Sequence, residues 1–145
     1  MMTYPMLFKV TAEAASGIQT TWSTQSMHDS QKAVMAIPPE FSGPGGGFSP
    51  EDLYAMALAN CFVATFKVFA EKSRLSFSQI KVHTTLSVDR NEKGQPWMAK
   101  AGLNIEISGV AQKEIAQRLL EKTSQGCMIL NSVLTEKSFE FKVLA

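Results

Sequence analysis

One segment constrains the fold of this chain more than any other: from Leu53 to Phe69, almost every residue is apolar or small. A helix without a polar face belongs inside a core rather than on a surface. At about 1.5 Å per residue, a helix over 50–73 would be about 36 Å long, which is difficult for one small chain to cover. We therefore expect a homodimer in which a second copy buries part of this helix.

The residues before the apolar run show where the helix begins. Ser49 is a favourable N-cap, and Pro50 suits the first helical position. Glu51 and Asp52 then suit the positive end of the helix dipole. Three polar side chains interrupt the apolar run: Asn60, Thr65 and Lys67. The run therefore falls short of the ~20 apolar residues that a spanning helix needs, and we expect no membrane partner.

Length and charge narrow the class of protein. The chain has 145 residues, with 14 Lys and Arg against 13 Asp and Glu, and a net charge of +1. This length predicts a single domain over 1–145 that can bury a core without disulfides or metals. The near-neutral charge excludes strong electrostatic binding of nucleic acid. Lys9 and Glu13 interrupt the only stretch that could act as a secretory leader, so we expect a cytoplasmic protein.

Alternation of apolar and polar residues predicts strands on both sides of the helix. Before it, half-buried alternation at 6–13 and strand-forming stretches at 18–24 and 33–37 predict an antiparallel meander, with turns near 15–17 and 26–32. After it come strands at 80–89 and 101–107, a helix around 115–123 capped by Gly126, a helical turn within 127–134 and a strand at 139–143. This order indicates an α+β fold.

The loop from Pro38 to Phe48 contains four glycines and three prolines. Glycine-rich loops can bind phosphate, but a P-loop needs Lys and then Ser or Thr after the glycines, whereas Phe48, Ser49 and Pro50 follow here. A dinucleotide site needs a parallel βαβ unit, which this pattern lacks. We therefore expect no nucleotide cofactor.

The two cysteines are the residues that most suggest chemistry. Cys61 lies in the middle of the apolar helix, and Cys127 directly follows Gly126. Both could be inert core residues, because free cysteine often packs as a small hydrophobic side chain. They could also form a redox couple of nucleophile and resolving thiol if the fold brings them together. His28 and His83 do not have the ligand spacing of a zinc site with the cysteines, and we expect both on the surface.

Two blocks of sequence around the cysteines form a recognisable pattern. The first, PPEFSGPGGGFSPEDLYAMALANCFVAT ending at Thr65, combines a Gly-rich loop, a Pro-Glu helix start and an Ala-rich helix that ends in Ala-x-Cys-Phe. The second, GCMILNSVL from Gly126, places a cysteine before a short helix with Asn or Ser and a hydrophobic residue. Together they resemble the OsmC/Ohr family, the osmotically inducible and organic hydroperoxide resistance proteins. The flanking strands also fit that family, so the resemblance extends over the whole chain.

The resemblance implies an OsmC-like fold, in which antiparallel β-sheets wrap around the long central buried helix and two chains form an intertwined homodimer around their two central helices. It also implies a peroxiredoxin-like organic hydroperoxide reductase that uses no metal or organic cofactor and acts in oxidative stress defence. By this resemblance, Cys61 is the peroxidatic thiolate, Cys127 is the resolving thiol, and Glu51 is the carboxylate that orients an active-site arginine. The implied partners are an organic hydroperoxide and an external dithiol reductant.

The family's catalytic arginine has no counterpart before the Pro-Glu helix. Gln19 stands in the region where the hydroperoxide-resistance branch has it. The three arginines all come later: Arg74, Arg90 and Arg118. Either Lys9 or Lys32 substitutes, without arginine's bidentate fork, or the helix N-terminus suffices, or peroxidase activity is weak or lost.

Helix geometry separates Glu51 from Cys61. Ten residues place them about 15 Å apart along the axis and about 80° apart around it. Either the helix breaks between them or two subunits contribute to one site, and both alternatives favour a dimer. If Cys61 is not activated, the alternative function is a non-catalytic dimer that binds a hydrophobic small molecule at its interface. A structural dimer with two inert cysteines is the third possibility.

Overall fold

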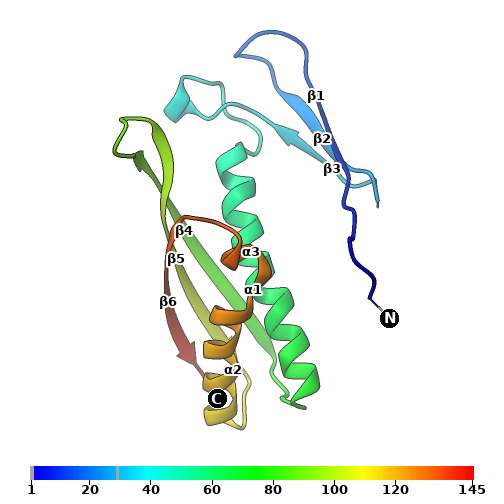
Figure 1. Cartoon of the computed structure of the whole chain (residues 1–145), viewed down its shortest axis with the longest axis vertical. Helices are drawn as coiled ribbons and strands as arrows, with labels where there is room; N and C mark the ends of the chain where they lie inside the picture. Colours follow the sequence, from blue (N-terminus) through cyan, green and yellow to red (C-terminus); the bar gives the residue numbers. More distant parts are fainter. Residues whose placement is uncertain (1, 29) are drawn as a thin grey trace. The chain divides into compact units, whose positions relative to one another are not determined.

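The computed structural model describes residues 2–28 and 30–145 (Figure 1). Its elements follow one another along the chain as β1 (Val10–Glu13), β2 (Trp22–Ser26), β3 (Lys32–Met35), η1 (Pro39–Phe41), α1 (Pro50–Lys72), β4 (Gln79–Arg90), β5 (Pro96–Ser108), α2 (Lys113–Gly126), α3 (Met128–Asn131) and β6 (Glu136–Val143). The chain divides into two compact units, Met1–Leu53 and Tyr54–Ala145. The element order confirms the predicted α+β class.

The first unit holds an antiparallel sheet in the order β1-β2-β3, as predicted. The prediction of a half-buried first strand is wrong, because β1 begins only at Val10 and all four of its residues are exposed. The predicted turn at 26–32 includes position 29, which lies outside the described residues. Within the glycine-rich loop, η1 forms one turn of 3-10 helix, and Phe48 pairs with Met35 in an isolated bridge.

The start of α1 matches the sequence prediction. Ser49 accepts a hydrogen bond on its Oγ from the Asp52 amide at 3.0 Å, and the Ser49 amide donates back to the Asp52 carboxylate at 3.0 Å. This reciprocal pair satisfies amides that a helix N-terminus leaves without partners. The helix then continues without a break to Lys72.

The second unit holds a three-stranded sheet in the order β4-β5-β6. β4 and β5 pair antiparallel, but β6 pairs parallel to β5, so the prediction of purely antiparallel sheets is wrong for this unit. The chain leaves β5 through α2 and α3 before it enters β6 (Figure 1). A helical crossover of this kind returns the chain in the same direction, which a tight hairpin cannot do.

One face of this sheet forms the core. Alternate residues of β5 are fully buried from Ala101 to Ile107, whereas those between them, such as Asn104 and Glu106, are exposed or partly exposed. Against the buried face, α1 packs a stripe of Leu58, Phe62, Phe66 and Ala70. The Phe62 ring lies 6.1 Å from Phe139 and 6.3 Å from Phe141, measured between centroids. These aromatic contacts fix the rotation of α1 about its own axis.

The opposite side of α1 is not covered by its own chain. Met56, Asn60, Ala64 and Val68 recur there at intervals of four residues, and all four are exposed. One chain therefore covers the helix only in part, as its length and apolar composition predicted. By length and hydropathy alone, α1 could cross a membrane, but core helices of soluble proteins meet the same test.

We predict that truncating the core stripe of α1 destabilises the fold. Phe66→Ala should lower the free energy of unfolding by about 3–5 kcal/mol in urea titrations, because it removes a fully buried ring and leaves a cavity. Val88→Ala, at a position that is 40% exposed on β4, should cost less than about 1 kcal/mol and serves as the control. Phe62→Glu should give insoluble protein, since an unpaired buried charge costs several kcal/mol. Equal losses for Phe66→Ala and Val88→Ala would contradict this description of the core.

Candidate redox site

The first cysteine is placed by the core stripe of α1. Cys61 directly precedes the buried Phe62, so its side chain lies about 100° around the helix from that ring. It is partly buried, and it packs against the edge of the core. The rotation of α1 that buries the phenylalanines therefore also aims the Cys61 sulfur.

The second cysteine lies at the joint between α2 and α3. Gly126 was predicted as a C-terminal cap, but it is the last helical residue, and Cys127 is the C-cap, with extended backbone angles. A Cβ at Gly126 would lie 3.4 Å from the Phe69 ring of α1, which is an ordinary van der Waals contact. The end of α2 therefore lies against α1, and a small side chain would also fit at this position.

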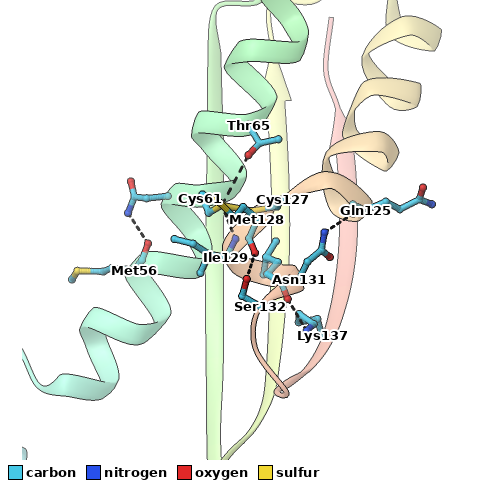
Figure 2. Close-up of a disulfide and its surroundings, with 12 residues drawn as sticks. Met56, Cys61, Thr65, Gln125, Cys127, Met128, Ile129, Asn131, Ser132 and Lys137 are labelled. Atoms are coloured by element: carbon cyan, nitrogen blue, oxygen red, sulfur yellow. Dashed lines mark hydrogen bonds between the residues drawn. A yellow bond between two sulfur atoms is a disulfide. The ribbon is translucent and has the colours of Figure 1, made fainter. Parts of the chain in front are cut away.

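The two cysteines form a disulfide that joins α1 to this joint (Figure 2). They are 66 residues apart in sequence, and their Cα atoms are 6.2 Å apart, within the range that disulfides span. The fold therefore brings the two thiols together, which was the condition for a redox couple. Cys127 is fully buried, whereas Cys61 is partly exposed.

Two hydrogen-bond donors face the Cys61 sulfur. The Ile129 amide donates to it at 3.4 Å, and the Thr65 hydroxyl lies 4.0 Å from it, one helical turn further along α1. Figure 2 shows both contacts at the sulfur, one from Thr65 of the same helix α1 and one from Ile129 of α3. In the described part of the chain, no Lys or Arg side chain bonds to either cysteine. The polar partners of the Cys61 sulfur are thus neutral.

The segment after Cys127 is anchored on three sides. Ile129 binds Cys61 on α1, as above. The Asn131 side chain donates to the Gln125 carbonyl of α2 at 2.8 Å. The Lys137 ammonium, from β6, donates to the Leu130 and Val133 carbonyls at 2.8 and 2.9 Å. These bonds connect a single turn of helix to three neighbouring elements.

Glu51 lies in the first turn of α1. Since α1 is continuous from Pro50 to Lys72, a break in the helix between Glu51 and Cys61 is excluded. The Glu51 Oε1 atom is buried and has no hydrogen-bond partner among the described residues. Buried polar atoms normally have a partner, so this carboxylate oxygen requires an explanation.

The cations and histidines considered from the sequence are on the surface. Lys9, Lys32 and the three arginines are exposed, and Arg90 donates to the Gly94 carbonyl in the turn after β4. Gln19 is also exposed and donates to the Ser42 carbonyl at 2.9 Å within the first unit. His28 and His83 are exposed, as predicted. No group of three His, Cys, Asp or Glu residues in the described ranges could hold a metal ion.

A small apolar hollow of about 220 Å³ lies in the second unit. It is lined by Tyr54, Trp97, Met98, Val133, Leu134 and Thr135. The hydroxyls of Tyr54 and Thr135 are 2.6 Å apart. Cys61 follows Tyr54 by seven positions, or about two helical turns, so both lie on nearly the same side of α1, about 10 Å apart along its axis.

Sequence reasoning missed three residues of this site: Thr65, Ile129 and Lys137. Thr65 could have been found as a polar side chain four residues after a helical cysteine. Lys137 has the inward phase of β6, which it shares with Phe139 and Phe141, and this break in the pattern was a signal. Ile129 contributes only its backbone amide, so its side chain carried no signal.

The fold and the site define an α+β protein in which a cysteine on a long helix meets a cysteine at the joint of two further helices. The chain belongs to the OsmC-like protein family, whose family model matches residues 43–142. This confirms the resemblance noted from the two cysteine blocks.

Individual relatives agree with this assignment. An organic hydroperoxide resistance protein of Xanthomonas axonopodis pv. citri (strain 306) is 28% identical over 102 residues, which cover 69% of this chain and 70% of the relative. A solved OsmC-like protein of unknown function from Vibrio cholerae superposes with a TM-score of 0.82 at 18% identity, over 94% of this chain and 99% of that one. An organic hydroperoxide resistance protein OsmC from Legionella pneumophila gives 0.74 at 21% identity, over 99% and 100%. The fold is therefore that of OsmC-like proteins.

Proposed function

We propose that this protein is a thiol-dependent reductase of organic hydroperoxides that acts as a homodimer in oxidative stress defence. The observation that carries the proposal is the contact between Cys61 and Cys127, which lie in the two blocks that resemble the family. The relative from Xanthomonas, named for organic hydroperoxide resistance, supports the same class of function. We place the protein in the cytoplasm, where cellular dithiols would return the disulfide to its reduced form.

The reaction would proceed in three balanced steps. The Cys61 thiolate attacks the peroxide O–O bond, takes one oxygen as a sulfenic acid and, with one proton, releases the other as an alcohol. The Cys127 thiol then attacks the Cys61 sulfur, which forms the disulfide and releases water. Finally, an external dithiol reduces the disulfide and is itself oxidised to a disulfide.

The burial of the two cysteines supports this division of roles. A peroxide must reach the first sulfur, and Cys61 is the partly exposed one. Cys127 is fully buried, so it suits a thiol that reacts only with its neighbour. The Ile129 amide and the Thr65 hydroxyl can each donate a hydrogen bond to a Cys61 thiolate, which lowers the free energy of the charged form.

The hollow beside Tyr54 supports an organic rather than an inorganic peroxide. Its lining is mainly apolar, and Tyr54, which lines it, lies on nearly the same side of α1 as Cys61. An alkyl chain of the substrate could rest there while its peroxide group reaches the sulfur. The same hollow also supports the second candidate function, a non-catalytic protein that binds a hydrophobic small molecule.

Two features support a homodimer. The exposed stripe of α1 contains Met56, Ala64 and Val68, which a second copy would cover. Because α1 does not break between Glu51 and Cys61, a site that uses both would need residues from two subunits. The buried Glu51 oxygen, which has no hydrogen-bond partner among the described residues, is consistent with a cation that approaches it in such an assembly.

The two cysteines should fail in different ways when they are replaced. We expect Cys61→Ser to abolish turnover of cumene hydroperoxide with a dithiol reductant, because the nucleophile is gone. Cys127→Ser should instead leave a sulfenic acid on Cys61, detectable by mass spectrometry after dimedone treatment. If wild-type Cys61 reacts no faster than a free thiol with an ordinary pKa of ~8.5, the peroxidase proposal is refuted and the non-catalytic binding function is favoured.

The need for a cation near Cys61 can be tested by removing a positive charge and by adding one. If Lys9 or Lys32 supplies the cation, its replacement by Met should slow Cys61 oxidation about tenfold, which equals about 1.4 kcal/mol of transition-state stabilisation. Gln19→Arg should accelerate the same step, whereas Gln19→Ala should leave it unchanged. Lys100→Met, on the exposed side of β5, is the control for lost charge. Unchanged rates for both lysine variants would remove lysine from the mechanism.

The dimer should depend on the exposed stripe of α1. In sedimentation experiments we expect wild-type chains of 15.9 kDa to behave as dimers at micromolar concentration. Val68→Glu should weaken the dimer, because it buries a charge in the interface. Val88→Glu, outside the stripe, should leave the dimer intact. A stable wild-type monomer would contradict the assembly that we propose.

A further inference from the structure

Lys137 occupies an unusual place in β6. Its side chain shares the inward phase of the strand with Phe139, Phe141 and Val143, whereas Lys142 has the outward phase. An apolar residue is expected at such a position, because burying an ammonium group costs free energy unless it is paired. A residue that breaks the pattern of its own strand often serves a function.

The partners of Lys137 explain how the ammonium is accommodated. It donates to the Leu130 carbonyl at 2.8 Å and to the Val133 carbonyl at 2.9 Å, and it meets no carboxylate within ion-pair distance in the described part of the chain. Hydrogen bonds from a charged donor are among the stronger ones in proteins. Figure 2 shows the ammonium beside the short turn that follows Cys127.

Lys137 is one of several residues that hold this turn in place, beside the Ile129 amide on Cys61 and the Asn131 side chain on α2. α3 has only four residues, and a single helical turn is unstable by itself. Leu130 is its fully buried core anchor, Ile129 and Val133 are partly buried against the core, and Met128 is 72% exposed. The position of Cys127 and of the Ile129 amide at Cys61 therefore depends on these apolar contacts together with the polar bonds from Asn131 and Lys137.

We propose that Lys137 is a positioning residue for the cysteine pair: its ammonium holds the 128–133 turn so that Cys127 and the Ile129 amide stay against the Cys61 sulfur. Lys137 touches neither sulfur, and it acts through the two carbonyls. The assignment of Lys137 to the resolving step rests on the proposed function. The effect of Lys137 on formation of the Cys61–Cys127 disulfide does not, and it can be measured without a hydroperoxide.

The test measures the equilibrium constant between the full chain and glutathione for opening the Cys61–Cys127 disulfide. Two glutathione thiols lose two electrons and two protons to the Cys61–Cys127 disulfide, which yields two protein thiols and one glutathione disulfide. Lys137→Met should lower the effective concentration of the Cys61 and Cys127 thiols toward each other about tenfold, so that glutathione reduces the disulfide more readily. A change of this size is expected for the loss of charged hydrogen bonds. Lys142→Met, on the outward phase of the same strand, should stay within about twofold of wild type. Lys137→Arg keeps the charge and should recover most of the loss, to within about threefold of wild type.

A purely structural role would give a different result. In that case Lys137→Met would lower the Tm of the oxidised and reduced forms equally and leave the glutathione equilibrium unchanged, which would overturn the proposal. If Lys137→Met does not fold, Lys137→Gln takes its place, and an unchanged equilibrium for that variant overturns the proposal equally. A shifted equilibrium in a protein that reduces no hydroperoxide would support the role of Lys137 and refute the proposed function.

Discussion

The packing of one stripe of α1 on the β4-β5-β6 sheet is the constraint on which the rest of the second unit depends. Phe62 and Phe66 are fully buried, and the Phe62 ring meets Phe139 and Phe141 of β6. A helix has only one rotation that buries this stripe, and turning it by one residue would swing every side chain by about 100°. The direction of the Cys61 sulfur is therefore a consequence of hydrophobic packing rather than of any polar contact.

The second cysteine reaches the first because of the parallel pairing of β5 and β6. A parallel pair needs a crossover, and here α2 and α3 form it. The joint between the two helices returns across the same face of the sheet that α1 covers, and α1 and α2 share one hydrophobic core there. Topology thus brings together two residues that are 66 positions apart, and local hydrogen bonds only complete their alignment.

Local patterns were sufficient to predict most elements, because hydrophobic periodicity and the Ser49 cap act over a few residues. They predicted α1 to within one residue of its end, and they predicted the α+β order. The parallel direction of β6 was not predictable in this way, since the register Leu103 with Phe139 depends on a long-range pairing. The two cysteines were identified from the sequence blocks, but their contact depends on the fold. The Ile129 donor could not have been found, because a backbone amide has no residue-type signal.

In the proposed function, the residues around the Cys61 sulfur would link the attack on the peroxide to the formation of the disulfide. An arginine beside Cys61 would stabilise the thiolate whatever the position of the turn after Cys127. Here one polar partner of the sulfur is the Ile129 amide, two residues after the second cysteine. Under the proposed function, the segment that brings the resolving thiol would therefore also be the segment that stabilises the attacking one. If this turn moved away, Cys61 would lose a donor and its resolving partner together, so both proposed steps would depend on the same single turn of helix and on the bonds that hold it.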